Sequence, residues 1–131
     1  MCGGIRKSGR DIVVEHKSLI PRDWTVRENG QAISHDIPLS YWRFIRTEKI
    51  LTYWQKFVEE WVQLHVDAFY EKNQWFELPE SRSILLGIYY DDENEGGWTS
   101  GIVTCPAAPP VLQVHHRMPL ITQKWKVKET A

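Results

Sequence analysis

The stretch ILLGIYYDDENEGGWTSGIVT, residues Ile84–Thr104, does the most to decide the fold class of this chain. Two runs rich in β-branched and aromatic residues, Ile84–Tyr90 and Trp98–Thr104, flank the acidic segment Asp91–Gly97. Because the acidic segment is rich in turn-forming residues and ends in two glycines, the pattern predicts a hairpin with a solvated loop.

One long helix is predicted between Thr47 and Leu64. Apolar residues recur there at spacings of three and four, as in an amphipathic helix. They are Ile50, Leu51, Trp54, Phe57, Val58, Trp61 and Val62. Upstream, the β-branched residues of Asp11–Glu15 predict a short strand, and Pro21 excludes a helix interior. We therefore expect an α+β fold: a mixed, strand-dominated sheet or partly closed barrel with one long amphipathic helix.

Length and composition predict a single domain over residues 1–131, with a polar C-terminal tail at about residues 122–131. The 131 residues are 42% hydrophobic and 25% charged, which suits one globular core. No run reaches the roughly 20 apolar residues that span a bilayer, and no signal-type segment follows the N-terminus. We expect a cytoplasmic protein without a membrane partner.

A net charge of −1 excludes a broadly basic nucleic-acid surface, so any polyanion contact must be local.

The two cysteines, Cys2 and Cys105, do not indicate a disulfide framework. Cys2 is the more informative, because removal of Met1 would leave a free 1,2-aminothiol, with ordinary pKa values of about 8 for the amine and about 8.5 for the thiol. Such a group condenses with an aldehyde to a Schiff base, and the thiol then attacks the imine to close a thiazolidine. Position two therefore predicts a nucleophile for aldehydes.

Further candidate chemical residues lie far from Cys2 in the sequence. They are Arg46, Glu48, Glu71, His115, His116 and Arg117. Glu71 follows an aromatic segment, and apolar surroundings raise a carboxyl pKa toward the range useful for proton transfer. Histidine changes charge near neutral pH, and arginine holds phosphate through a planar fork. Adjacent histidines in an extended segment point in opposite directions, so we expect only one of the pair to face a site.

Two metal-site alternatives are weaker. A zinc site built from Cys2, Cys105, His115 and His116 would lack a close Cys-x-x-Cys pair and would require the adjacent histidines to converge. The segment Leu112–Arg117 is also similar to the start of a His-Asn-His nuclease motif, but no His, Asn or Asp follows it in the sequence. We therefore predict no metal and no other cofactor.

Six segments occur in an order that is typical of one family. They are Met1–Gly3, Leu19–Trp24, Arg46–Glu48, Asp67–Glu71, Ile102–Ala107 and Val114–Leu120. On these segments the chain resembles the SRAP family, the SOS-response-associated peptidases or abasic-site processing proteins. The resemblance covers nearly the whole chain, and its most specific parts are Cys2 and the block His115–Pro119.

The resemblance implies an SRAP-like fold and a sensor of abasic sites in single-stranded DNA, acting in the SOS response to DNA damage. The sugar left by base loss opens to an aldehyde, which the processed N-terminal cysteine traps as a covalent thiazolidine crosslink. By position, Cys2 would be the aminothiol, Glu71 the proton-transfer carboxyl, and His115 the histidine that helps to open the sugar ring.

The resemblance also implies the residues that bind DNA. Arg46 and Arg117 match arginines that hold phosphates, and Trp24 and Trp42 could stack on exposed bases. In a chain of net charge −1, such local contacts would supply the affinity.

This chain also departs from the family at several positions. Gly4 stands where the family has an arginine, and Arg6 could take that role. Phe44 replaces an asparagine, and Lys72 replaces a tryptophan. The chain is therefore identified as a short, divergent member.

Three functional hypotheses follow. The first is an enzyme with crosslinking or lyase-type activity at abasic sites. The second is a thiol peptidase, acting mainly on its own N-terminus, with Cys2 as nucleophile and His115 as base. The third is a degenerate module that binds single-stranded DNA without chemistry. We expect a monomer.

Overall fold

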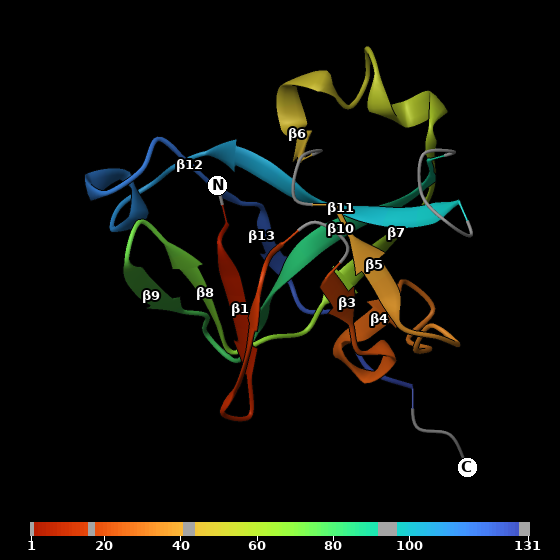
Figure 1. Cartoon of the computed structure of the whole chain (residues 1–131), viewed down its shortest axis with the longest axis horizontal. Helices are drawn as coiled ribbons and strands as arrows, with labels where there is room; N and C mark the ends of the chain where they lie inside the picture. The colour runs from red at the N-terminus through yellow and green to blue at the C-terminus, as the bar shows by residue number, and fades with distance from the viewer. Residues whose placement is uncertain (1, 16–17, 41–43, 92–96, 129–131) are drawn as a thin grey trace.

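The computed structural model describes residues 2–15, 18–40, 44–91 and 97–128, and these residues are mostly strands (Figure 1). The described strands are β1 Gly4–Lys7, β2 Arg10–Val13, β3 Ser18–Ile20, β4 Thr25–Arg27, β5 Ile37–Leu39, β6 Ile45–Arg46, β7 Val58–Leu64, β8 Ala68–Glu71, β9 Gln74–Glu77, β10 Arg82–Tyr90, β11 Trp98–Pro106, β12 Arg117–Pro119 and β13 Ile121–Gln123. The described helical segments are short 3-10 turns, η1 Arg22–Trp24, η2 Thr47–Lys49, η3 Trp54–Lys56 and η4 Val111–Gln113.

The strands form two sheets. The smaller sheet has the order β2-β1-β8-β9, and each neighbouring pair is antiparallel. The larger sheet, which is curled, has the order β3-β5-β11-β10-β7-β4. In addition, β6 and β12 pair with β11, and β13 pairs with β10. Figure 1 shows β1, β8 and β9 side by side, with β10 and β11 crossing the molecule beside them.

The predicted hairpin is confirmed. β10 and β11 pair in antiparallel register from Leu86 opposite Ile102 to Tyr90 opposite Trp98. The loop residues 92–96 lie outside the described residues. The hairpin also forms the centre of the larger sheet, because β7 pairs along the other side of β10 and β5 runs parallel to β11.

The predicted α+β fold with a long helix from Thr47 to Leu64 is wrong. The segment instead forms η2, a turn, η3 and then strand β7. The spacing of three and four did not mark one buried face, since Leu51 is 82% exposed whereas Trp54 is 8% exposed. Aromatic and β-branched residues fit a pleated strand better than a helix, and pairing of β7 with both β10 and β4 decides the outcome.

The main core lies between the two sheets. On the smaller sheet, Ile5, Phe69 and Phe76 stand in register across three strands and are nearly inaccessible. Val62, Leu86 and Ile102 form the corresponding row of the larger sheet. All six belong to one buried cluster, which also contains Cys2. A second buried cluster comprises Ile45, Trp54, Tyr89 and Val103. Tyr89 of β10 and Val103 of β11 lie on the opposite face of the larger sheet from Leu86 and Ile102, because successive side chains of a strand point to opposite faces.

The segment predicted as a polar tail contacts the rest of the protein as far as Lys128. The amides of Lys124 and Lys128 donate to the carbonyls of Ser81 and Gly30, and the amide of Trp125 donates to the side chain of Gln63. No described helical segment is long and apolar enough to pass through a membrane.

Candidate functional site

Three of the predicted site residues meet at one end of the smaller sheet. Cys2 directly precedes β1, and Glu71 is the last residue of the neighbouring β8. The amide of Gly3 donates to the carbonyl of Tyr70 at 2.8 Å, which holds the start of β1 against the end of β8. Nδ1 of His115 lies 3.9 Å from Oε2 of Glu71. Residues from the beginning, middle and end of the chain thus share one site.

The thiol of Cys2 is completely buried. Its Sγ donates to the carbonyl of Gly4 at 3.3 Å, and none of its surface is exposed. Burial, followed in magnitude by the negative charge of Glu71, raises the pKa of the Cys2 thiol to about 12. The sulfur in this arrangement is therefore a protonated thiol at neutral pH, and not a thiolate.

Glu71 is a buried carboxyl beside a histidine. Only 1% of the residue is exposed, and burial raises the pKa of its carboxyl above the ordinary value. A raised pKa brings a carboxyl closer to the range in which it both gives and takes protons near neutral pH. His115, with Nδ1 at 3.9 Å from Oε2 of Glu71, places a second titratable group beside this carboxyl.

His115 and His116 lie next to each other, and their rings do not diverge as the sequence predicted. The ring centroids are 4.5 Å apart and the ring planes differ by 32°. The reason is that this segment is a turn between η4 and β12, where the alternation of a strand does not apply. Nδ1 of His115 lies 2.9 Å from the carbonyl oxygen and 3.1 Å from the amide nitrogen of Arg117, so the backbone of Arg117 holds this ring nitrogen in place whichever tautomer the ring adopts.

Arg117 is buried and committed to contacts within the protein. It is 7% exposed. Its guanidinium donates to the carbonyl and hydroxyl oxygens of Thr104 at 2.9 and 3.0 Å and to Oε2 of Glu48 at 2.6 Å. The hydroxyl of Thr47 and then Arg117 lower the pKa of Glu48 to about 2. Arg117 therefore anchors β12 to β11 and to η2.

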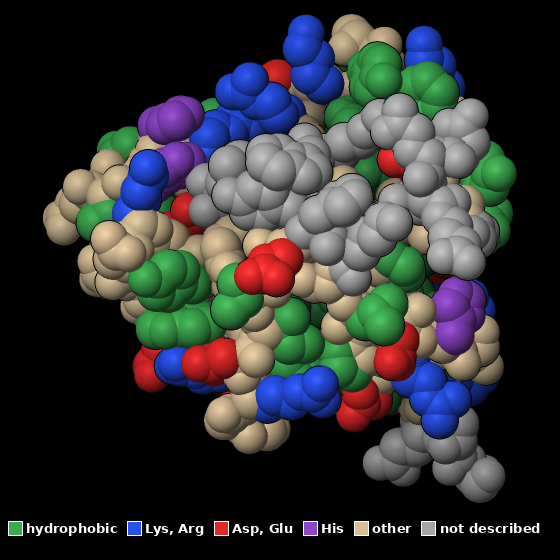
Figure 2. All heavy atoms as spheres, viewed as in Figure 1, with side chains coloured by type: hydrophobic (Ala, Val, Ile, Leu, Met, Phe, Trp, Pro, Cys, Tyr) green, Lys and Arg blue, Asp and Glu red, His purple; other side chains and the backbone are tan. Residues whose placement is uncertain are grey.

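Arg46 and His116 form the exposed rim of the site. Nε of Arg46 lies 3.8 Å from Oε2 of Glu48, and 56% of the Arg46 side chain is exposed. Desolvation, together with the charges of His115, Arg117 and Arg46, lowers the pKa of His116. Figure 2 shows histidine side chains directly beside a group of lysine and arginine side chains on this face.

The remaining predicted DNA-binding residues are placed differently. Trp24 is 5% exposed and belongs to the main core, so no face of its ring is available for a base. Arg6 makes two hydrogen bonds to Asp11, at 2.6 and 3.1 Å, and its guanidinium carbon lies 3.9 Å from the ring centroid of Trp75. Trp42 lies outside the described residues.

Gly4 and Arg6 lie on the same outer face of the smaller sheet. A Cβ atom on Gly4 would be 3.4 Å from Cη2 of Trp75, the ring that Arg6 covers. Arg6 thus extends over the region that a longer side chain at position 4 would reach.

Sequence reasoning missed Thr104, whose two oxygens bind Arg117. A threonine inside a β-rich run carries no signal of such a contact, because it appears only once β12 pairs with β11. The pair Glu48–Arg117 could have been suspected from charge alone, although nothing in the spacing joins the two.

Across residues 2–15, 18–40, 44–91 and 97–128, no group of three or more His, Cys, Asp or Glu side chains is arranged to hold a metal ion. The two cysteines are both free thiols.

Comparisons with protein-family models, with curated proteins and with solved structures each find no match to this chain. The site must therefore be interpreted from its own residues.

Proposed function

We propose that this chain is an SRAP-like protein that traps the aldehyde of an abasic site in single-stranded DNA through Cys2. The observation that carries the proposal is the meeting of Cys2, Glu71 and His115, which are remote in sequence. Burial, and then the charge of Glu71, raise the pKa of the Cys2 thiol, and Oε2 of Glu71 lies 3.9 Å from Nδ1 of His115. Such a cluster of nucleophile, carboxyl and imidazole suits condensation with a carbonyl.

The proposed reaction begins once Met1 has been removed. The amine of Cys2 adds to the aldehyde carbon of the opened sugar, and the carbinolamine loses water to give a Schiff base. The thiol of Cys2 then adds to the imine carbon, its proton passes to the nitrogen, and a thiazolidine ring closes. The net change is loss of one water molecule, with no oxidant or reductant required.

Glu71 and His115 are suited to the proton transfers of this reaction. Loss of water requires a proton donor at the carbinolamine oxygen, and the raised pKa of Glu71 lets it hold a proton at higher pH than an exposed carboxyl does. His115, in contact with that carboxyl, can restore the proton. Ring opening of the deoxyribose requires the same kind of acid and base assistance.

The exposed rim of the site is suited to the DNA backbone. Arg46 is its exposed arginine, and the exposed His116 beside it can donate a hydrogen bond. Phosphate contacts from such residues position a strand without reading its sequence. A local contact through Arg46 reconciles DNA binding with a net charge of −1. We also propose that the protein acts in the cytosol, where a reducing environment keeps Cys2 free.

The test is covalent capture of DNA. The purified protein, with removal of Met1 verified by intact mass, is incubated with a single-stranded oligonucleotide that carries an abasic site, and adducts are resolved on a denaturing gel. We expect a stable adduct that disappears in Cys2→Ala and persists in the matched control Cys105→Ser. We expect Glu71→Gln to slow its formation by roughly a hundredfold. The proposal fails if the processed protein forms no adduct.

A second candidate function is binding of single-stranded DNA without covalent chemistry. The complete burial of the Cys2 thiol favours it, because a nucleophile must reach its substrate. In that case Cys2→Ala would bind the abasic oligonucleotide as well as the parent protein does, and salt would weaken both equally. Formation of the denaturation-resistant adduct would exclude this alternative.

A further inference from the structure

One edge of the larger sheet is open along half of its last long strand. β4 pairs with β7 only from Thr25 opposite Leu64 to Arg27 opposite Val62. The chain then turns away, and the amide of Gly30 donates to the carbonyl of Arg27. Within the described part of the chain, no strand pairs with residues 58–61 of β7 on this side. Their outward backbone groups are therefore available to another strand.

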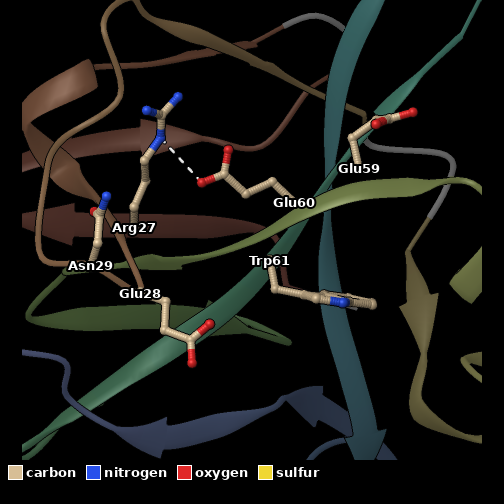
Figure 3. A pocket seen from close by; sticks show the side chains of 6 residues that line it. All are labelled: Arg27, Glu28, Asn29, Glu59, Glu60 and Trp61. Carbon is tan, nitrogen blue, oxygen red and sulfur yellow. Dashed lines mark ion pairs between the residues drawn. The ribbon is translucent and has the colours of Figure 1, made fainter.

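A hollow lies beside this open edge. It has a volume of about 570 Å³, and its lining residues are Arg27, Glu28, Asn29, Glu59, Glu60 and Trp61 (Figure 3). Figure 3 shows the side chains of Arg27 and Glu60 pointing toward each other from β4 and β7. The hollow is thus lined by the residues at and just after the end of β4 and by residues 59–61 of β7.

A second, apolar hollow adjoins the first. It has a volume of about 230 Å³ and shares Arg27, Glu59 and Glu60 with its neighbour. Ile33, Ile37 and Ile88 line it, together with the 45% exposed ring of Trp98. A side chain entering from the open edge would thus meet an aliphatic surface within reach of the backbone groups of β7.

The charge around both hollows is negative. Nε of Arg27 lies 3.1 Å from Oε2 of Glu60, so this pair is largely neutralised. Glu28 and Glu59 remain exposed at the same rim. The register between β7 and β10 shifts at this point, so that no residue of β10 lies opposite Glu59. This bulge lets Glu59 and Glu60 line the same hollows, although neighbours in a regular strand face opposite sides.

We propose that the open edge of β7 binds an extended segment of another protein in which basic and apolar residues alternate. Main-chain hydrogen bonds to residues 58–61 would add the segment as a strand in the line of β4. An apolar side chain would enter the hollow beside Ile88, and a basic side chain would pair with Glu59 or Glu28. A second copy of this chain does not fit, because two such edges would oppose glutamates with glutamates.

The experiment uses a fluorescent, end-capped peptide of alternating lysine and valine, titrated with the full chain and followed by anisotropy. We expect saturable binding, with shifts of the backbone amide signals of Glu59–Trp61 in nuclear magnetic resonance spectra. A peptide of the same sequence with alternate amides N-methylated should not bind, because it cannot complete the strand ladder. Absence of binding by the parent peptide overturns the proposal.

Charge-reversal variants separate this site from general attraction of a cationic peptide. The double variant Glu28→Lys with Glu59→Lys should weaken binding by about tenfold. A control with the same change of charge, Glu77→Lys with Glu80→Lys, alters the end of β9 and the turn before β10 and should not change binding. Urea unfolding of each variant establishes that the fold is retained. Equal weakening by the control, or equal binding of the N-methylated peptide, would overturn the proposal, because attraction alone would then explain the result.

Discussion

Arg117 binds Glu48 through a 2.6 Å hydrogen bond that joins residues 69 positions apart. The same guanidinium holds both oxygens of Thr104, so it ties β12, β11 and η2 together behind His115. The arginine that the family resemblance assigns to DNA is thus mainly an internal support. It fixes the turn that carries His115 toward Glu71.

Replacement of Arg117 should therefore destabilise the fold. In Arg117→Ala, buried acceptors on Thr104 lose their donor, and we expect the free energy of unfolding to fall by roughly 2 kcal/mol. Urea titration measures the loss. The matched control is Arg46→Ala, whose side chain is 56% exposed and which should change stability by less than about 0.5 kcal/mol. Similar losses in both variants would contradict the internal role of Arg117.

Stability should fall in mildly acidic solution because of His65. Burial, and then the charges of Lys124 and Lys7, lower the pKa of His65 from 6.5 to about 4. Between these two values the unfolded chain binds a proton that the folded chain does not, so stability declines as the pH falls through this window. Urea unfolding at several pH values would measure the decline. His65→Gln should flatten it, and an unchanged slope in that variant would contradict the assignment.

Glu48 should also make stability fall with falling pH, in a more acidic range than His65. Its pKa is lowered from 4.5 to about 2, so its contribution to the free energy of unfolding is complete above pH 4.5 and is lost as the pH falls toward 2. In Glu48→Gln this second decline should be smaller, as measured by thermal unfolding over the acidic range. A decline of equal size in the variant would show that another carboxyl is responsible.

Gly30 should be intolerant of any side chain. Its φ is +88°, and a Cβ atom would lie 2.8 Å from the carbonyl oxygen of Lys126 and 3.0 Å from the amide nitrogen of Lys128. We expect Gly30→Ala to cost roughly 3 kcal/mol and to speed hydrogen exchange at the Lys128 amide. Gly9→Ala is a matched control, since its φ is +78° with no atom within 4 Å, and it should cost only about 1 kcal/mol. Equal costs would mean that backbone strain alone matters.

The two cysteines should differ in reactivity. Cys2 is fully buried with a thiol pKa of about 12, whereas Cys105 is partly exposed. In native protein at neutral pH we expect iodoacetamide to modify Cys105 at least about tenfold faster than Cys2, with comparable rates in urea. Peptide mass spectrometry resolves the two sites. Rapid native modification of Cys2 would show that the thiol reaches solvent more readily than its burial implies.

The hairpin was predictable from sequence, whereas the long helix was not. Residues 84–104 carry two β-rich runs and a turn segment, and these local signals agree with the final pairing of β10 and β11. Between Thr47 and Leu64 the local spacing favoured a helix, but pairing of β7 with two other strands overrode it. The spacing of apolar residues alone does not distinguish a helix from a strand in a segment where aromatic and β-branched residues dominate.

The candidate site was predictable in its members but not in its arrangement. Cys2, Glu71 and His115 were singled out by their chemistry and by the family resemblance, and the fold brings them together. The sequence did not show which of these side chains are buried, and the fold places Arg117 and Trp24 in the interior. The parallel pairing of β5 and β6 with β11 was also hidden, because the paired segments are remote in the chain.

The assembly of the site from such distant residues has a consequence for how its reactivity is controlled. Cys2, Glu71 and His115 are neighbours only when β1 lies on β8 and the turn before β12 is in place. In an unfolded chain the three would be separated by long, flexible stretches, and none would influence the others. An unfolded molecule would carry Cys2 as an accessible thiol of ordinary pKa, whereas in the folded molecule the same thiol is buried and its pKa is raised to about 12. Folding therefore both assembles the cluster and shields its sulfur from solvent.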